Sequence, residues 1–414
     1  MDHSRQDDAV QPNLAPPDAG GGLPFSLRPL MFVIFVCSMA MMAFVALAGP
    51  IARVIGLEPW QIGMAMTIAG IAWMIMGRVW GRLSDRHGRR PILLISLAAF
   101  TVSYFLLSLF IDLALRTAMA PLLAFAGLVA GRGVAGLFYA AVPPTTTALV
   151  ADHTGPRERA GAMAAIGASS AAGMVIGPGF AGLAAPVSLS LPLYATAALP
   201  VIGLLVLWRT LPRDVPKAAP PRRPLGLFDP RLRRPMAMAF VAMFSVSIAQ
   251  IAVGFFALDR LGLDPAGAAR ASGLSLAIVG TALVCAQVIL RKLGWPPARL
   301  IRIGALVGGV GFASTVLAVN QPMLWASYAV AAFGMGWVYP SISALTANSV
   351  EANEQGAAAG TISAAQGLGT IVGPIVGMAL YGIDNGAPYM LIGVLLVGAA
   401  LWPARRSAAG RPGS

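Results

Sequence analysis

Charge is scarce in this sequence of 414 residues. Only 11 % of the residues are Asp, Glu, Lys or Arg, whereas 57 % are hydrophobic and the mean hydropathy is +0.76. Soluble domains carry roughly 25 % charged residues, so this deficit indicates an integral membrane protein. The net charge of +13 lies in short patches between apolar runs. This distribution favours orientation of loops at a membrane and argues against nucleic-acid binding.

Residues that bind metals or perform catalysis are also few. The two cysteines, Cys37 and Cys285, lie in different apolar runs, and neither they nor the three histidines form a cluster with ligand spacing. We therefore expect no disulfide, metal site or cofactor. No phosphate-binding G-x-x-x-x-G-K-[ST] motif and no arrangement of nucleophile and base is present. These features indicate that the protein is not an enzyme.

Twelve apolar stretches are long enough to cross a bilayer, whose core of about 30 Å requires about 20 helical residues. They are residues 30–52, 60–80, 91–112, 119–146, 160–186, 190–209, 236–258, 268–290, 300–319, 323–347, 356–382 and 388–404. The prolines Pro143, Pro144 and Pro340 are expected to interrupt the fourth and tenth helices. The sequence thus predicts an all-α integral membrane protein with 12 transmembrane helices.

The basic residues alternate between the two sides of the membrane. With the N-terminus inside, 24 of them fall on the inner side, 4 on the outer side, and Arg132 within a span. This bias predicts cytoplasmic termini in a bacterial-type inner membrane. Residues 1–28 lack the apolar core and cleavage site of a signal peptide, so they are predicted to be a disordered cytoplasmic tail. Residues 405–414 are predicted to be a second cytoplasmic tail.

A basic, proline-rich stretch at 210–234 divides the spans into two sets of six. It is predicted to be a cytoplasmic linker between lobes at 29–209 and 235–404. The second lobe repeats features of the first, because 158–178 and 354–374 share a glutamate, two glycines and a proline at an offset of 196 residues. Parallel repeats of this kind are typical of transporters, in which the substrate site lies between the lobes near the midplane.

The loop after the second span carries the most specific motif. Residues 81–90 read Gly-Arg-Leu-Ser-Asp-Arg-His-Gly-Arg-Arg, which resembles the signature loop G-x-L-a-D-r-x-G-r-[kr] of the major facilitator superfamily. The resemblance covers residues 28–404 and implies two six-helix lobes that transport a substrate. In that family the loop contacts the opposite lobe and closes the cytoplasmic side. The residues that would form this conformational latch are Gly77, Gly81, Asp85, Arg86, Gly88, Arg89 and Arg90.

Our hypothesis for the latch has Asp85 as its centre and Arg89 as the partner of Asp85. Because Gly77 and Gly81 are four residues apart, they leave a bare helix face that could approach the small residues at 356–360. Asp85 would then lie near the N-terminus of the eleventh helix, where the helix dipole favours a carboxylate. The alternative is that the loop only sets topology, and full transport by Asp85→Asn would favour this alternative.

A second motif surrounds the one charge within a span. Residues 132–140 begin with Arg132 and resemble the superfamily's fourth-helix motif R-x-x-x-G-x-x-x-[ag]. The resemblance implies a role for Arg132 in proton transfer, and an arginine inside a membrane is a functional candidate in any case. The alternative is an arginine nearer the interface, whose side chain extends to the lipid headgroups.

A third motif lies in the fifth span and favours export. Gly173, Gly177, Pro178 and Gly182 resemble the pattern G-x-x-x-G-P-x-x-G-G of the antiporting branch, with Ala181 replacing one glycine. The alternative is close packing of small residues, because 369–377 repeats the pattern in the eleventh span.

Carboxylates are missing from the middle of the spans. The nearest are Asp112 and Asp259, both toward outer ends, and the first span has none. Proton coupling therefore rests on the resemblance, and a neutral or anionic substrate fits at least as well as a cation. Methionine-rich and aromatic walls adapt to varied ligands, although each such residue could equally be core packing. The candidates for the substrate cavity are Met39, Met42, Phe44, Tyr139, Phe244, Gln250, Trp337 and Tyr339.

These features predict a secondary active transporter of the drug:proton antiporter kind. It would export a drug, metabolite or siderophore-like product by alternating access, driven by the proton gradient. The alternative is an importer of a nutrient or organic acid, by proton symport in the same fold. The expected partners are a small-molecule substrate and the lipid bilayer, and we expect a monomer. A membrane receptor or assembly factor that does not transport is a further alternative.

Overall fold

The computed structural model describes residues 26–211, 229–351 and 354–402, and within these segments all regular structure is helical. Most of the predicted linker and nearly all of both predicted tails lie outside these residues. The helices are α1 (Leu27–Val54), α2 (Pro59–His87), α3 (Arg89–Arg116), α4 (Pro121–Tyr139), α5 (Val142–His153), α6 (Pro156–Ala184), α7 (Leu191–Thr210), α8 (Arg233–Asp259), α9 (Pro265–Leu293), α10 (Pro297–Ser314), the short 3₁₀ helix η1 (Thr315–Leu317), α11 (Gln321–Ala347), α12 (Gln355–Tyr381) and α13 (Ala387–Leu401).

Eleven of the twelve predicted spans are long and apolar enough to cross a membrane, when α4 and α5 are counted together. The twelfth is the apolar helix α13, which has only 15 described residues. The prediction of an all-α membrane fold is therefore confirmed, with a last helix that is shorter than expected.

Two predicted proline interruptions have different outcomes. The fourth span does break between Tyr139 and Val142, because Pro143 stands in the first turn of α5, where its missing N–H is not needed. The predicted break at Pro340 is wrong, since α11 continues through this residue from Gln321 to Ala347. One proline inside a membrane helix removes a single hydrogen bond, which neighbouring groups in a packed bundle can offset.

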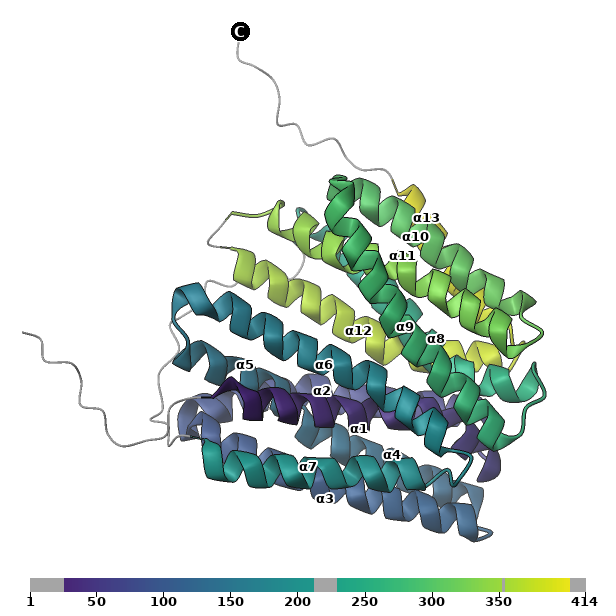
Figure 1. Cartoon of the computed structure of the whole chain (residues 1–414). Coiled ribbons are helices and arrows are strands. Elements are labelled where there is room, and N and C mark those ends of the chain that lie inside the picture. Colours follow the sequence, from purple (N-terminus) through teal and green to yellow (C-terminus); the bar gives the residue numbers. More distant parts are fainter. Residues whose placement is uncertain (1–25, 212–228, 352–353, 403–414) are drawn as a thin grey trace, which may run out of the picture.

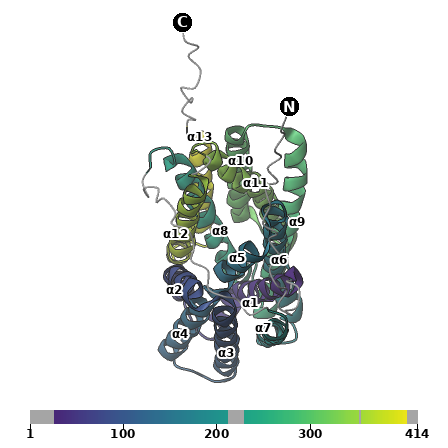
Figure 2. The same ribbon diagram turned by 90° about the vertical axis from the view of Figure 1, so that its left-hand side faces the viewer.

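The helices form two lobes with the same internal packing (Figures 1 and 2). In the first lobe α1 packs against α6 and α4 against both α2 and α3; in the second, α8 packs against α12 and α11 against both α9 and α10. The lobes meet mainly where α2 contacts α12 and where α6 contacts α9. Two equivalent helix pairs therefore form the largest part of the interface between the lobes.

Large apolar side chains cover the outside of the bundle. On α3, for example, Ile95, Val102 and Leu106 are all more than half exposed. In a soluble protein such exposure would be unfavourable, but a bilayer solvates it. Polar groups turn inward instead, as when the buried Tyr104 donates its hydroxyl to the carbonyl oxygen of Ala40 at 2.6 Å.

Candidate functional site

The predicted latch loop forms an ionic cluster within the first lobe. Gly88 joins α2 to α3 with a φ of +94°, a conformation that glycine adopts easily and L side chains rarely do. The turn places Arg89 between two carboxylates: it forms an ion pair with Asp85 and another with Asp152 of α5 at 3.1 Å. Arg89 also donates to the hydroxyl of Ser84 at 3.0 Å. The predicted partnership of Asp85 and Arg89 is thus present.

The other predicted latch residues do not reach the second lobe in this structure. A Cβ at Gly77 would lie 3.9 Å from the carbonyl oxygen of Ala140, which belongs to the same lobe. A Cβ at Gly81, Gly356 or Gly360 would meet no atom within 4 Å. The expected contact between the two bare faces is therefore not made here. Arg86 is exposed, whereas Arg90 donates to the carbonyl oxygen of Trp208 at 2.8 Å.

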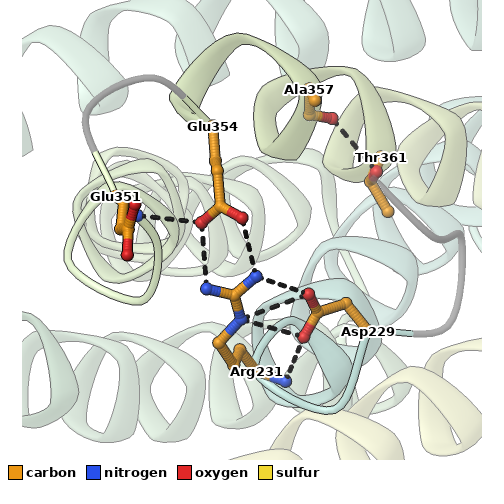
Figure 3. Close-up of polar contacts among 6 residues, drawn as sticks. All are labelled: Asp229, Arg231, Glu351, Glu354, Ala357 and Thr361. Carbon is orange, nitrogen blue, oxygen red and sulfur yellow. Dashed lines mark hydrogen bonds and ion pairs between the residues drawn. The ribbon is translucent and has the colours of Figure 1, made fainter. Parts of the chain in front are cut away.

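At the same end, the second lobe has an ionic cluster of its own (Figure 3). Arg231, two residues before α8, reaches both oxygens of Glu354 at the start of α12, at 2.9 and 3.0 Å. It also binds Asp229 at 2.8 Å, and the backbone N–H of Glu351 donates to Glu354 at 3.1 Å. Thr361 is turned away, since its hydroxyl bonds to its own helix at Ala357. The cluster fastens the start of α8 to the start of α12.

These contacts displace the pKa values of the cluster. Hydrogen bonds from the Arg231 side chain hold the pKa of Glu354 and that of Asp229 below their usual range, and the two carboxylates raise the pKa of Arg231. All three groups are therefore charged at neutral pH. In the sequence, Glu354 stands out only as the repeat of Glu158, and no partner was predicted for it.

The opposite end of the molecule is closed by contacts between the lobes. Arg53, at the end of α1, binds both oxygens of Asp259, at the end of α8, at 2.6 and 2.7 Å. Tyr381 of α12 donates to Asp259 at 3.0 Å. Beneath this pair the helices touch through backbone, because a Cβ at Gly49 would lie 2.8 Å from the backbone nitrogen of Phe255. Among the described residues this is the one ion pair that joins the two lobes.

Farther inward, the lobes cross at two equivalent points. A Cβ at Gly63 of α2 would lie 2.6 Å from the carbonyl oxygen of Pro374 of α12, and a Cβ at Gly273 of α9 would overlap that of Pro178 of α6. Contact this close requires glycine. One crossing has an additional bond, because the hydroxyl of Thr67 donates to the carbonyl oxygen of Ile371 at 2.6 Å.

These two crossings were not predicted, although the sequence contains a signal for them. Gly63 and Gly70 are seven residues apart on α2, and Gly273 and Gly280 repeat this spacing on α9 at an offset of 210 residues. A Cβ at Gly70 would lie 3.1 Å from the side chain of Ile371, and a Cβ at Gly280 would overlap the side chain of Val175.

The predicted antiporter motif divides into two parts. Gly173 and Gly177 pack within the first lobe, where a Cβ would overlap the carbonyl oxygens of Phe35 and Met39 on α1. Pro178 and Gly182 instead face α9, with Gly182 against Gly273.

The repeat in α12 packs in the same way. A Cβ at Gly369 would lie 2.7 Å from the carbonyl oxygen of Phe240, and one at Gly373 would lie 2.9 Å from that of Phe244, both on α8. The geometry of the two motif glycines therefore matches the alternative, close packing of small residues.

Arg132 is buried within the first lobe, with only 3 % of its surface exposed. Its two terminal nitrogens lie 3.6 Å from the sulfur of Met41 and 3.5 Å from that of Met66, and its guanidinium lies 4.4 Å from the ring centroid of Phe44. Thioethers are weak acceptors, and Nε has no hydrogen-bond partner among the described residues. The side chain therefore does not extend to an interface. It is a buried cation that is held by weak contacts. Burial of such a charge costs free energy, which makes Arg132 a candidate functional residue.

The predicted cavity residues do not form one group. Phe44 lies under Arg132, and Tyr139 lies 3.4 Å from the hydroxyl of Ser38. Met39 and Phe244 are buried in helix crossings.

The remaining candidates are in the second lobe or partly exposed. Tyr339 is directed toward Ala242 and Met243 of α8. Trp337 is bonded to the carbonyl oxygen of Ala286 and packed against Trp295, so it belongs to the core of the second lobe. Met42 and Gln250 are partly exposed, and their place in a cavity stays a prediction.

Comparison with known proteins agrees with this architecture. The family model described as "Major Facilitator Superfamily" matches residues 30–374 and, again, 295–413. A "Tetracycline resistance protein, class G" of Vibrio anguillarum is 28 % identical over 340 residues, covering 78 % of this chain and 81 % of the relative. "Multidrug resistance protein 1" of Bacillus subtilis is 27 % identical over 385 residues, covering 91 % and 95 %.

A solved structure gives the same fold. The crystal structure of a bacterial homologue of the human lysosomal transporter Spinster, in an inward-facing and occupied conformation, superposes with a TM-score of 0.71. It shares 15 % sequence identity, and the match covers 90 % of this chain and 94 % of that one. This chain is a multi-pass membrane protein that belongs to the major facilitator superfamily of transporters.

Proposed function

We propose that this protein is a secondary active exporter of small molecules that works by alternating access and proton antiport. The observation that carries the proposal is the unequal closure of its two ends. The lobes are joined by the pair of Arg53 and Asp259 at one end, whereas at the other a Cβ at Gly81 or Gly360 would meet no atom within 4 Å. A carrier alternates between two states in which opposite ends are closed. This arrangement fits the state in which the end with Arg53 and Asp259 is closed.

The direction of transport rests on the relatives. Proteins named for resistance to tetracycline and to multiple drugs match over most of this chain. We place the Asp85 end in the cytoplasm of a bacterial inner membrane, because basic residues are concentrated there. In this orientation the protein is open to the cytoplasm and takes up its cargo from that side. The substrates are drug-like or metabolite-like molecules.

Arg132 is the coupling residue in this proposal. Among the described residues the guanidinium has no carboxylate partner, and a buried cation of this kind favours the deprotonated form of nearby acidic groups and the binding of anions. The proton gradient supplies the energy.

Flux into everted membrane vesicles tests the proposal. Tetracycline and a panel of other drugs would be added with and without a proton gradient, for the wild type, Arg132→Ala and Arg116→Ala. Arg116 is the control, because its side chain is 73 % exposed and lies near the other end of the bundle. We expect uptake that needs the gradient, is lost in Arg132→Ala and persists in Arg116→Ala. Gradient-independent flux that ignores Arg132 would contradict antiport, and accumulation by intact cells would indicate an importer.

A further inference from the structure

An apolar groove lies on the outside of the first lobe, between α3 and α7, which lie side by side in both views (Figures 1 and 2). Its volume is about 320 Å³. The groove is separate from the interface between the lobes. Its lining residues are Leu94, Ile95 and Ala98 of α3 and Leu204, Leu205 and Trp208 of α7.

The lining continues into basic residues at one end only. On α3, Arg90, Leu94 and Ala98 are spaced four apart, so they share one face of the helix. On α7, Leu205 and Arg209 have the same relationship. Both stripes therefore run from apolar side chains to an arginine at the end that carries the Asp85 loop.

The two arginines are differently placed for an anionic ligand. Arg209 is exposed. Arg90 is half-buried and fixed, since one terminal nitrogen donates to the carbonyl oxygen of Trp208 at 2.8 Å. Its Nε is buried and has no hydrogen-bond partner in the described part of the chain. A phosphate at this end of the groove would be attracted by the positive charges of both Arg90 and Arg209.

We propose that this groove is a binding site for one anionic phospholipid. The acyl chain occupies the slot between α3 and α7, and the phosphate lies against Arg90 and Arg209. The chemistry of the site changes from apolar to cationic along its length, which complements a lipid with a negatively charged headgroup. A zwitterionic lipid of the same chain length fills the slot without the net charge that the arginines attract. The site is independent of the transported substrate and of the proton coupling proposed above.

Native mass spectrometry of the purified full chain tests the proposal, with phosphatidylglycerol and phosphatidylcholine of equal chain length as probes. The variants are Arg90→Gln with Arg209→Gln, and Ala98→Phe, which fills the slot and keeps both charges. Arg302→Gln is the control, because Arg302 is an exposed arginine on α10, the equivalent of α3 in the other lobe.

We expect the wild type and Arg302→Gln to retain one phosphatidylglycerol in preference to phosphatidylcholine. The double variant should bind phosphatidylglycerol roughly 30-fold more weakly, because each basic side chain near an anionic lipid contributes a factor of about 5. Ala98→Phe should weaken the binding of both lipids. Equal binding of the two lipids by the wild type would overturn the proposal, as would unchanged phosphatidylglycerol binding by the double variant. Dimers that depend on the groove and exclude lipid would also overturn it.

Discussion

Arg53 and Asp259 bind each other through both carboxylate oxygens, across a separation of 206 residues in the chain. They come from the ends of α1 and α8, which occupy equivalent positions in the two lobes. Tyr381 holds Asp259 from a third helix. The pair is therefore placed to keep one end of the interface between the lobes closed, and every state in which that end opens must break it.

Asp259→Asn should shift the protein toward the state that is open at this end. The arginine and aspartate side chains are 43 % and 25 % exposed, and ion pairs of this kind contribute up to about 1 kcal/mol. The expected shift in the ratio of the two states is therefore roughly 5-fold at most. Pulsed electron paramagnetic resonance with spin labels at Val54 and Arg260, in a background without Cys37 and Cys285, would measure it.

The control for this prediction is Asp112→Asn. Asp112 forms an ion pair with Arg116 at 3.0 Å, but both residues belong to α3, so this pair does not link the two lobes. Asp112→Asn should leave the distance distribution unchanged. Equal distributions for Asp259→Asn and the wild type would show that the backbone contacts alone keep this end closed.

The motif glycines should behave as packing residues. Gly177→Ala places a methyl group against the carbonyl oxygen of Met39, and Gly373→Ala places one against Ser247 and Phe244. Overpacking of this kind costs about 1–3 kcal/mol. We expect similar falls in the thermal unfolding midpoint for both variants and almost none for Gly167→Ala, since a Cβ at Gly167 meets no atom within 4 Å. A loss of transport in Gly177→Ala with unchanged stability would instead support a role specific to antiport.

The fold could be predicted from sequence because membrane-spanning helices are recognisable by their length and hydropathy. The signature loop likewise predicted the pair of Asp85 and Arg89, whereas the second partner of Arg89, Asp152, was not predicted. The pairing of Arg53 with Asp259 could not be predicted, because the two residues are 206 positions apart and no motif around either residue indicates its partner. The helix break predicted at Pro340 was wrong, because the sequence does not show which groups of the folded bundle surround a proline. Trp337 was predicted for the cavity from its residue type, whereas its bond to Ala286 and its packing against Trp295 place it in the core of the second lobe.

Trp337→Phe tests this reassignment. The indole N–H donates to the carbonyl oxygen of Ala286 at 3.0 Å, and the ring packs against Trp295 and Phe333. Removing the bond should cost roughly 1 kcal/mol of unfolding free energy and leave the order of preference among substrates unchanged. Drug-resistance profiles beside thermal unfolding would separate the two effects, and a reordered profile would return Trp337 to the cavity wall.

The ionic cluster of the second lobe should give a pH-dependent contribution to stability. The pKa of Glu354 is lowered in the folded protein, because Arg231 donates hydrogen bonds to its carboxylate. A lowered folded pKa means that the stabilisation is fully present above the unfolded value of about 4.3. It is lost as the pH falls through the folded value. Glu354→Gln should therefore lower the unfolding midpoint at pH 7 and converge with the wild type under acid. Glu351→Gln is the control, since only the backbone of Glu351 contacts the cluster; a constant gap at every pH would contradict the prediction.

The latch hypothesis makes a prediction that separates Asp85 from its neighbour Asp152. Both carboxylates bind Arg89 in this structure, so a purely local fastening of α2, α3 and α5 would make Asp85→Asn and Asp152→Asn equally harmful. A latch between lobes requires Asp85 in addition to meet the N-terminus of α12 when this end closes, where the helix dipole stabilises a carboxylate by about 0.3–1 kcal/mol. We therefore expect Asp85→Asn to slow export more than Asp152→Asn at equal thermal stability. Initial export rates and unfolding midpoints of the two variants, measured side by side, decide between these readings, and equal rates would leave the loop with a local structural role.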